Sequence, residues 1–415
     1  MTETGMYLTI SKRFHFSASA RLYRADWNDV RNQAAYGLAS VGEHGHGYNY
    51  EAVFVFHGPV DEDTGMMLNV TDIKKRVGRM IDDRYDHKFL NRDTASFKDL
   101  VPTPENLAAQ LLREAIPLFK GENAAPVACH LTDSFRSAAT AYADGRVERD
   151  HWVEFSAARR TYSPNLSDEE NNALFGASAS RSGHGHNYRL RVTLAGEVDG
   201  ESGLIAPLAV TRTALGAIRK EFDHKNINVQ VRGMKDLPVT TESLARYIRE
   251  RLDVDLPVSR VKLYELPGFF AEYTGEDQCL LGVSRRFHAA HRLHSPKLDD
   301  AGNRDIYGIC NNPNGHGHEY KVEATIGGKY NAVVGALYDF VAFTRALKAS
   351  LEPWNFKHLD LDTDDFGDVP STGENIVARL WPKLDDRLDN KLHRLRLWET
   401  PNNRFTLRRN FGEVS

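Results

Sequence analysis

Polar and apolar positions in the last third of the chain follow an order that the two preceding thirds also show. Leu280–Leu293 and His318–Ile326 are predicted as strands, and polar and apolar residues roughly alternate in the second of them. Tyr338–Leu351 follows with the spacing of apolar residues that is typical of a helix. His393–Glu399 and Arg404–Arg409 then predict two further strands.

A second helix is expected before the last two strands, where each third of the chain carries a threonine motif. In the first third, Thr103 precedes Pro104, which is typical of a helix N-cap followed by proline at the first helical position. The predicted order is strand, strand, helix, helix, strand, strand. Such strands can form one antiparallel sheet with both helices on one face, so the expected fold class is α+β.

Four short motifs return in the same order and at nearly the same spacing in each third. A chance match of one motif is easy to find, but four matches in register indicate a repeat of domain size. The motifs are Phe16–Arg21, Phe155–Arg160 and Phe287–Arg292; Gly45–Tyr50, Gly183–Tyr188 and Gly315–Tyr320; Asp86–Lys88, Asp223–Lys225 and Lys357–His358; and Thr103–Asn106, Thr240–Ser243 and Thr372–Asn375.

The repeat predicts three tandem units, which we place at residues 1–147, 148–276 and 277–415 and call copies one, two and three. Short linkers without low-complexity sequence join them, and short connections place sequential units side by side. Each open sheet would have exposed edges, which a ring of three sheets joined edge to edge removes. We therefore expect a pseudo-trimeric barrel with the helices outside.

Composition narrows the class of protein further. The formal net charge of −4 gives no indication of nucleic acid or an anionic membrane as a partner. The first fourteen residues contain no long apolar run, so we expect neither a signal peptide nor a transmembrane segment. Three cysteines are too few for a disulfide framework and favour a reducing, cytoplasmic setting.

Copy three carries a candidate metal site. His316 and His318 are two residues apart on a predicted strand, so both rings point to one face. His291 ends the preceding strand and is within reach of that face. Three imidazoles leave a fourth tetrahedral position open, which is the arrangement of a catalytic zinc site. The alternative is that these are surface or core histidines.

The order of elements and the four motifs resemble the tunnelling fold of the 6-pyruvoyl-tetrahydropterin synthase and 6-carboxytetrahydropterin synthase family. The resemblance covers nearly the whole chain, once per copy. In that family, single-domain subunits form a trimeric ring and two rings stack. The resemblance therefore implies that one chain supplies a whole ring, and that two chains form a homodimer, with a monomer as the alternative.

The resemblance also implies the catalytic groups. Cys310 corresponds to the family's catalytic cysteine, and its equivalents are predicted at Ser40 and Ser178. The family completes this cysteine with an Asp–His pair from a neighbouring subunit. The candidate catalytic residues are the pair Asp223–His224 and His358, with Asp86–His87 in reserve. In copy three, Lys357 precedes His358 in place of an aspartate. The zinc ligand positions read Ala20, His46 and Tyr48 in copy one and Arg159, His184 and His186 in copy two, so neither copy is expected to hold zinc tightly.

The family's last functional element is a strand glutamate that anchors the pterin through two hydrogen bonds. Copy three offers Glu399 and copy two offers Glu265, whereas copy one has Thr132 and Asp133. Each of these glutamates could also be an ordinary exposed residue.

The function implied is that of a zinc-dependent carbon–oxygen lyase acting on phosphates. It would convert 7,8-dihydroneopterin triphosphate to 6-pyruvoyl-tetrahydropterin and release triphosphate. Five residues separate Cys310 from His316, which resembles the longer loop of the pyruvoyl-forming enzymes. Two alternatives remain: 6-carboxytetrahydropterin synthase, and a pterin-binding or scaffold protein that has lost catalysis.

Overall fold

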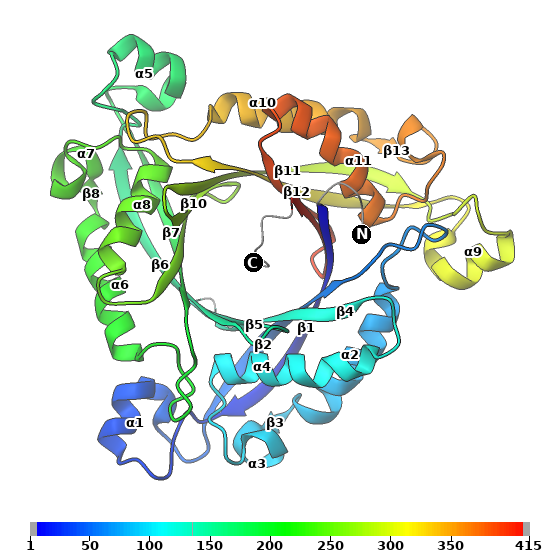
Figure 1. Ribbon diagram of the computed structural model, residues 1–415, viewed down its shortest axis with the longest axis horizontal. Helices are drawn as coiled ribbons and strands as arrows, with labels where there is room; N and C mark the ends of the chain where they lie inside the picture. The colour runs from blue at the N-terminus through cyan, green and yellow to red at the C-terminus, as the bar shows by residue number, and fades with distance from the viewer. Residues whose placement is uncertain (1–5, 135, 410–415) are drawn as a thin grey trace.

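The computed structural model describes residues 6–134 and 136–409 and shows one closed barrel (Figure 1). Fifteen strands form a single sheet, of which twelve make the barrel wall, four from each copy. The wall strands are β1 (Met6–Ala20), β2 (His46–His57), β4 (Ala125–Ser134) and β5 (Ser137–Tyr142); β6 (Val147–Arg159), β7 (His184–Ala195), β9 (Val258–Leu266) and β10 (Phe269–Gly275); and β11 (Gln278–His291), β12 (His316–Lys329), β14 (Leu392–Thr400) and β15 (Asn403–Arg409).

The copies join through antiparallel strand pairs. β5 pairs with β6, β10 pairs with β11, and β15 returns to pair with β1. These three pairings close the ring, so the predicted removal of sheet edges is confirmed. Three two-residue strands pair in parallel with the end of the first strand of their own copy: β3 (Lys88–Phe89), β8 (Lys225–Asn226) and β13 (Lys357–His358).

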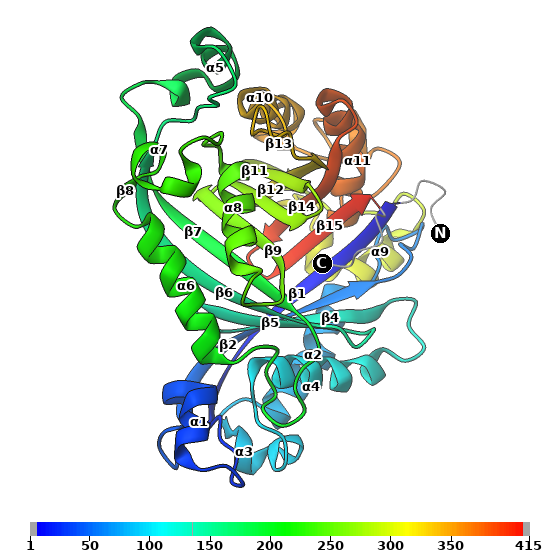
Figure 2. The same cartoon turned by 60° about the vertical axis from the view of Figure 1, so that its left-hand side comes forward.

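The helices lie outside the barrel, as Figure 2 shows from the side. They are α1 (Asp29–Tyr36), α2 (Val70–Arg84), α3 (Leu90–Asp93) and α4 (Pro104–Ala115) in copy one; α5 (Asp168–Phe175), α6 (Leu208–Phe222), α7 (Ile227–Gln230) and α8 (Thr241–Leu252) in copy two; and α9 (Asp300–Tyr307), α10 (Phe340–Leu351) and α11 (Gly373–Asp385) in copy three. Short 3-10 turns follow α1, α5 and α9, namely η1 (Gly37–Ser40), η4 (Gly176–Ala179) and η6 (Gly308–Asn311).

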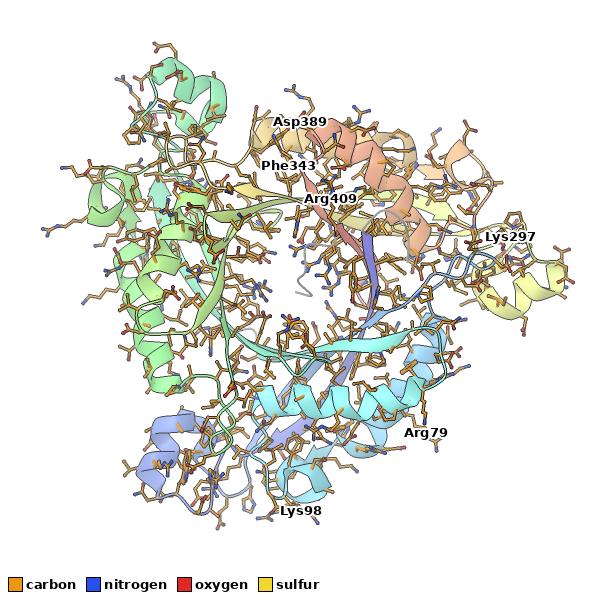
Figure 3. All side chains as sticks on the ribbon, viewed as in Figure 1. Arg79, Lys98, Lys297, Phe343, Asp389 and Arg409 are labelled. Carbon is orange, nitrogen blue, oxygen red and sulfur yellow. The ribbon has the colours of Figure 1, made fainter. Side chains whose placement is uncertain are left out.

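The hydrophobic core lies between the outer face of the barrel and these helices. Leu107 and Leu111 of α4 pack in the same buried cluster as Cys129 and Leu131 of β4. Cys279 is also fully buried. Side chains on the opposite face of the strands project into the central space, whereas Arg79, Lys98 and Lys297 lie on the outer rim (Figure 3).

At each junction between copies, a threonine that caps a helix also donates a hydrogen bond to the neighbouring copy. Thr103 accepts a hydrogen bond from the backbone N–H of Asn106 at 3.2 Å and donates to the carbonyl of Gly203 in copy two at 2.7 Å. Thr372 likewise caps α11 and donates to Gly65 of copy one at 2.7 Å. The threonine motif predicted as an N-cap is therefore a cap that also bridges two copies.

The predicted order places no helix between the first two strands of a copy, but the structure has one there in each copy. In copy three this segment contains α9 and η6, and the side chain of Asp299 caps α9 by accepting from the N–H of Gly302 at 2.7 Å. Helix α10 begins at Phe340, two residues later than predicted, because Asp339 is its N-cap. In the described ranges, no helix combines the length and apolar character needed to cross a lipid bilayer.

Candidate metal and catalytic site

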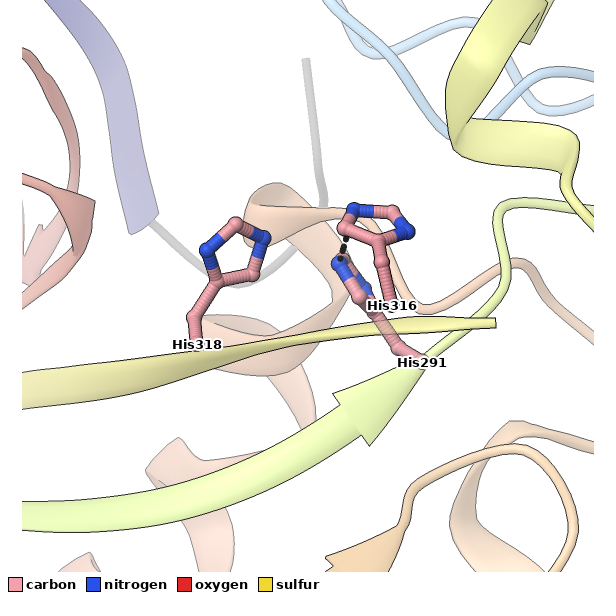
Figure 4. Close-up of side chains that lie close together, drawn as sticks. All are labelled: His291, His316 and His318. Atoms are coloured by element: carbon pink, nitrogen blue, oxygen red, sulfur yellow. Dashed lines mark hydrogen bonds between the residues drawn. The ribbon is translucent and has the colours of Figure 1, made fainter. Parts of the chain in front are cut away.

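Three histidines converge where β11 ends and β12 begins. His291 is the last residue of β11 and pairs in register with His316, the first residue of β12. His318 lies two residues along the same strand and therefore shares the face of His316. Figure 4 shows the three rings facing one another. The Nε2 atoms of His291 and His316 are 3.1 Å apart, and one ring nitrogen of each histidine lies within 4.8 Å of the others.

The surroundings of the three rings fit a bound cation. Nδ1 of His291 donates a hydrogen bond to the carbonyl oxygen of Ser371, 3.0 Å away. Because the ring proton is on Nδ1, the lone pair on Nε2 is free to bind a metal ion. Burial lowers the pKa of His291 to about 4, so the ring is neutral at pH 7. Nε2 of His318 is buried and makes no hydrogen bond within the part of the chain described. Neutral imidazoles and an unpaired buried nitrogen are what a zinc-type ion requires of its ligands.

Two acidic side chains lie near the triad. Oε1 of Glu399, on β14, is 3.8 Å from Nε2 of His291 and 4.0 Å from Nε2 of His318. Glu374, in the first turn of α11, is buried, and it accepts a hydrogen bond from the N–H of Met67 in copy one at 3.0 Å. Burial raises the pKa of Glu374 to about 7. The site therefore lies at the junction of copies three and one.

The equivalent junction of copy one contains an arginine in place of a metal site. Asp133 and Glu105 occupy the positions of Glu399 and Glu374; Glu105 is buried, and the side chain of Asp133 is 14% exposed. Arg149 reaches in from β6 of copy two, with its guanidinium nitrogens 3.6 Å from Glu105 and 3.8 Å from Asp133. Of the former ligand positions, only His46 is a histidine, and its Nε2 lies 2.7 Å from the carbonyl oxygen of Val41.

Copy two also contains an arginine, but at a different position. Arg159 stands at the register position of His291, opposite His184, and forms a buried ion pair with Glu265. Oε1 of Glu265 lies 2.9 Å from Nε2 of His186 and 3.8 Å from Nε2 of His184. These two histidines and Glu265 are close enough to one another to hold a metal. The guanidinium of Arg159, however, already supplies the positive charge that Glu265 requires.

The three junctions therefore differ in what neutralises their buried acids. Arg149 serves copy one and Arg159 serves copy two. In residues 6–134 and 136–409, no arginine or lysine forms an ion pair with Glu374 or Glu399. Buried carboxylates need a cation or hydrogen bonds to offset their desolvation, so copy three is the junction suited to a metal ion.

Cys310 lies in η6, beside the triad, and is half-buried. Burial, with a smaller contribution from the charge of Glu399, raises the pKa of its thiol. The chain alone therefore does not favour the thiolate of Cys310, and a cation bound nearby would favour it. The carbonyl oxygens of Ala39, Ser178 and Cys310 accept the same backbone hydrogen bond in the three copies, so the equivalent in copy one is Ala39 and not Ser40.

The structure corrects the alignment of the Asp–His motif in copy three. His87 and His224 have positive φ angles of 56° and 57°, and Phe356 has the matching angle of 58°. Each of these three residues donates its N–H to the first strand of its own copy. The equivalent of Asp–His is therefore Asn355–Phe356, two positions before Lys357–His358. Copy three has lost the histidine as well as the aspartate.

His358 instead lies against the loop that leads to His316. A Cβ atom added to Gly315 would be 2.6 Å from Nε2 of His358, so the ring packs directly on this glycine. Nδ1 of His358 is 3.7 Å from Asp360. The catalytic role of His358 stays a prediction, but its place in the fold is beside the metal site and not at the Asp–His position.

The two complete Asp–His pairs are intact and their histidines are exposed. Nδ1 of His87 is 2.7 Å from Asp86, and Nδ1 of His224 is 3.1 Å from Asp223. Both histidine side chains are 84% exposed. In the part of the chain that the structure covers, no hydrogen bond or ion pair connects either pair to copy three. Sequence reasoning found these pairs and placed Arg159 at a ligand position, but it did not predict that Arg149 and Arg159 pair with the acids of the other two junctions.

In the described residues, a closed barrel of three similar units with a histidine triad at one junction defines a tunnelling-fold protein with a candidate metal site. The family model for 6-pyruvoyl tetrahydropterin synthase matches residues 9–143, 150–276 and 281–410. The chain therefore belongs to the 6-pyruvoyl tetrahydropterin synthase family, with three copies of the family domain.

Individual relatives are the size of one copy. The 6-pyruvoyl tetrahydrobiopterin synthase of Homo sapiens is 39% identical over 133 residues, which are 31% of this chain and 92% of the relative. The protein of the same name from Drosophila melanogaster is 37% identical over 28% of this chain and 71% of its own length. The solved structure of Caenorhabditis elegans 6-pyruvoyl tetrahydropterin synthase is 35% identical, covers 31% of this chain and 94% of that chain, and has a TM-score of 0.31.

Proposed function

We propose that copy three is a zinc-dependent lyase that converts 7,8-dihydroneopterin triphosphate to 6-pyruvoyl-tetrahydropterin and releases triphosphate. The observation that supports this most strongly is the histidine triad beside Cys310 and Glu399, which is complete at one of three equivalent junctions. Relatives that match about one copy are named 6-pyruvoyl tetrahydrobiopterin synthase, and this supports the same reaction.

His291, His316 and His318 would hold the zinc ion. When bound, the ion would polarise the hydroxyl groups of the substrate side chain and make the adjacent protons easier to remove. The hydrogen bond from His291 to Ser371 would keep that ring in the tautomer that offers Nε2. Burial of His291 excludes water from one side of the site.

Glu399 would bind the amino-pyrimidinone edge of the pterin. It lies within 4.0 Å of two of the triad histidines, so an anchored pterin would extend its side chain toward the metal position. A carboxylate that accepts two hydrogen bonds from one edge is both charge-assisted and selective. Glu374 lies at the same junction and would add a second polar group there.

Cys310 would take and return protons at the substrate side chain, and an Asp–His pair would accept them from the cysteine. Copy three has Asn355 and Phe356 at that position, so the pair must come from another copy. His87 and His224 are exposed on the outside of the ring, where a second chain can reach them. We therefore propose that two chains form a homodimer and that each site takes its Asp–His pair from the partner.

A pterin-binding protein without turnover is the second candidate. The loss of both Asp and His at Asn355–Phe356 favours it, because no proton relay remains in copy three itself. The retention of Cys310 beside the triad favours the lyase.

The test is anaerobic incubation of the zinc-loaded protein with 7,8-dihydroneopterin triphosphate, followed by assays for triphosphate and acetaldehyde. We expect stoichiometric triphosphate without acetaldehyde, and we expect Cys310→Ala to abolish turnover while zinc is retained. Stoichiometric acetaldehyde would instead indicate a 6-carboxytetrahydropterin synthase. Neither by-product from zinc-loaded protein would indicate the binding protein.

A further inference from the structure

Copy two contains a cavity of about 440 Å³ at its junction with copy three. One end is polar and is formed by Arg159, His184, His186 and Glu265. The other end is lined by apolar and aromatic side chains from both copies. A cavity of this size can accommodate a small organic molecule.

At the polar end Arg159 and Glu265 neutralise each other, so Glu265 needs no metal ion. Arg159 is 3% exposed and is paired with Glu265, and the hydroxyl of Thr241 donates to the same carboxylate oxygen. Burial opposes ionisation of Glu265, but Arg159 and its other partners hold the pKa of this carboxyl well below its usual range. A metal ion would have to share this carboxylate with a fixed guanidinium, which the like charges disfavour. A charged ligand would face either Arg159 or Glu265 as a like charge.

The polar groups that remain free at this end are hydrogen-bond donors. Nε2 of His184 and Nε of Arg159 are buried and have no hydrogen-bond partner in the ranges 6–134 and 136–409, whereas Nε2 of His186 faces Oε1 of Glu265 at 2.9 Å. The Nε of an arginine always carries a proton, and an imidazole can carry its proton on Nε2, so Arg159 and His184 can both donate to a ligand. Buried donors without partners are costly, and a ligand that brings acceptors would remove that cost.

The apolar end is particular to copy two. Leu266 and Phe269 line it, and the equivalent positions in copy three are Thr400 and Asn403. Phe340 of copy three packs edge-to-face on Phe269, with ring centroids 4.5 Å apart. Leu266 and Phe340 are nevertheless 44% and 38% exposed, which leaves apolar surface uncovered at the cavity. Aromatic walls of this kind favour a flat aromatic ligand.

We propose that copy two is a second, metal-free binding site, which takes an uncharged planar aromatic molecule with hydrogen-bond acceptors along one edge. The ring system lies between Phe269, Phe340 and Leu266, and the acceptors face His184 and Arg159. Copy two has the Arg159–Glu265 ion pair and two histidines where copy three has three histidines and Glu399.

The test uses 7-methoxycoumarin, an uncharged two-ring lactone, as a fluorescent probe on the full-length protein. We expect saturable binding of one probe per chain, unchanged by EDTA and by His316→Ala, because neither affects copy two. 2-Methoxynaphthalene, which lacks the carbonyl acceptor, and 2-naphthoate, which is an anion, should each bind about tenfold more weakly. Phe340→Ala should weaken the binding of 7-methoxycoumarin by about tenfold through loss of one wall.

Phe356→Ala is the matched control, because Phe356 is 77% exposed and belongs to a different part of copy three. It should leave binding unchanged. The proposal is overturned if no saturable binding is found, if EDTA or His316→Ala abolishes it, if the naphthoate binds more tightly, or if Phe340→Ala has no more effect than the control. None of these measurements depends on turnover at Cys310. They can therefore contradict the binding site in copy two without contradicting the lyase activity proposed for copy three.

Discussion

One position of the repeat determines what each junction can bind. It is Ala20 in copy one, Arg159 in copy two and His291 in copy three, and each residue pairs with the first residue of the following strand. Alanine offers no ligand, arginine offers a fixed cation, and histidine offers a lone pair. The same backbone therefore carries three different chemistries.

Arg159→His should create a second metal site, in copy two. Arg159→Ala, in contrast, would remove a positive charge without adding a metal ligand. His184 and His186 already stand at the other two ligand positions, and the substitution frees Glu265 from its ion pair. We expect two zinc ions per chain in this variant, measured by plasma mass spectrometry. Arg251→His, at an exposed arginine of α8, is the control and should leave the count at one. A count of one in both variants would contradict our account of copy two.

Among individual residues, the sequence predicted the histidine triad but misaligned the Asp–His motif of copy three. Two histidines two residues apart on a strand must share a face, so the convergence of His316 and His318 follows from alternation alone. Lys357–His358 happens to look like a decayed Asp–His motif, and only the positive φ of Phe356 identifies the true equivalent. The ion pairs of Arg149 and Arg159 depend on contacts between distant segments, which no local pattern encodes.

Among the elements, the capped helices link local structure to the closure of the ring. The cap of α4 is Thr103, which is fully buried and also bonds to Gly203 of the next copy. The cap of α5 is Ser167, which is exposed and bonds within its own helix turn. The two caps differ mainly in the bond that crosses between copies.

Thr103→Ala should therefore destabilise the protein more than Ser167→Ala. Loss of a cap alone costs about 1 kcal/mol, and a buried carbonyl left without its donor adds about 1 to 3 kcal/mol. Urea unfolding followed by circular dichroism should show a lower midpoint for Thr103→Ala than for Ser167→Ala. Equal midpoints would mean that the bond to Gly203 contributes nothing to the joining of copies.

The pattern of polar and apolar residues along the chain predicted the long helices and strands but not the short ones. The long strands of copy three and helix α10 begin and end within three residues of their predicted ends, because alternation and helical spacing persist over many residues. Helix α9 has only 8 residues and lies in a segment predicted as a loop. Strand β13 has only 2 residues and exists because the chain returns alongside β11.

For the whole molecule, closure of the ring separates the proposed catalytic groups. The metal triad and Cys310 are in copy three, whereas the complete Asp–His pairs are in copies one and two, on exposed surface. A second chain stacked on the first could bring the two halves together. This predicts that activity depends on contact between chains.

Two inactive variants should complement each other. One chain carries His87→Ala and His224→Ala, and the other carries Cys310→Ala. If the two chains pair at random on co-expression, half of the dimers contain one chain of each kind. Each of these mixed dimers has one complete site out of two, so we expect about a quarter of wild-type activity. No activity in the mixture would place the relay within one chain. Full activity of the histidine double variant alone would show that the pairs are not needed.

The central claim is that a chain with three copies of the domain holds one working metal site, and native mass spectrometry of the wild-type protein tests it most directly. Protein purified without added zinc should show one zinc ion per chain, whether the chains occur singly or in pairs, and His316→Ala should show none. Two or three zinc ions per wild-type chain would contradict the assignment of arginine in place of metal at the other junctions. A wild-type chain without zinc would contradict the triad itself.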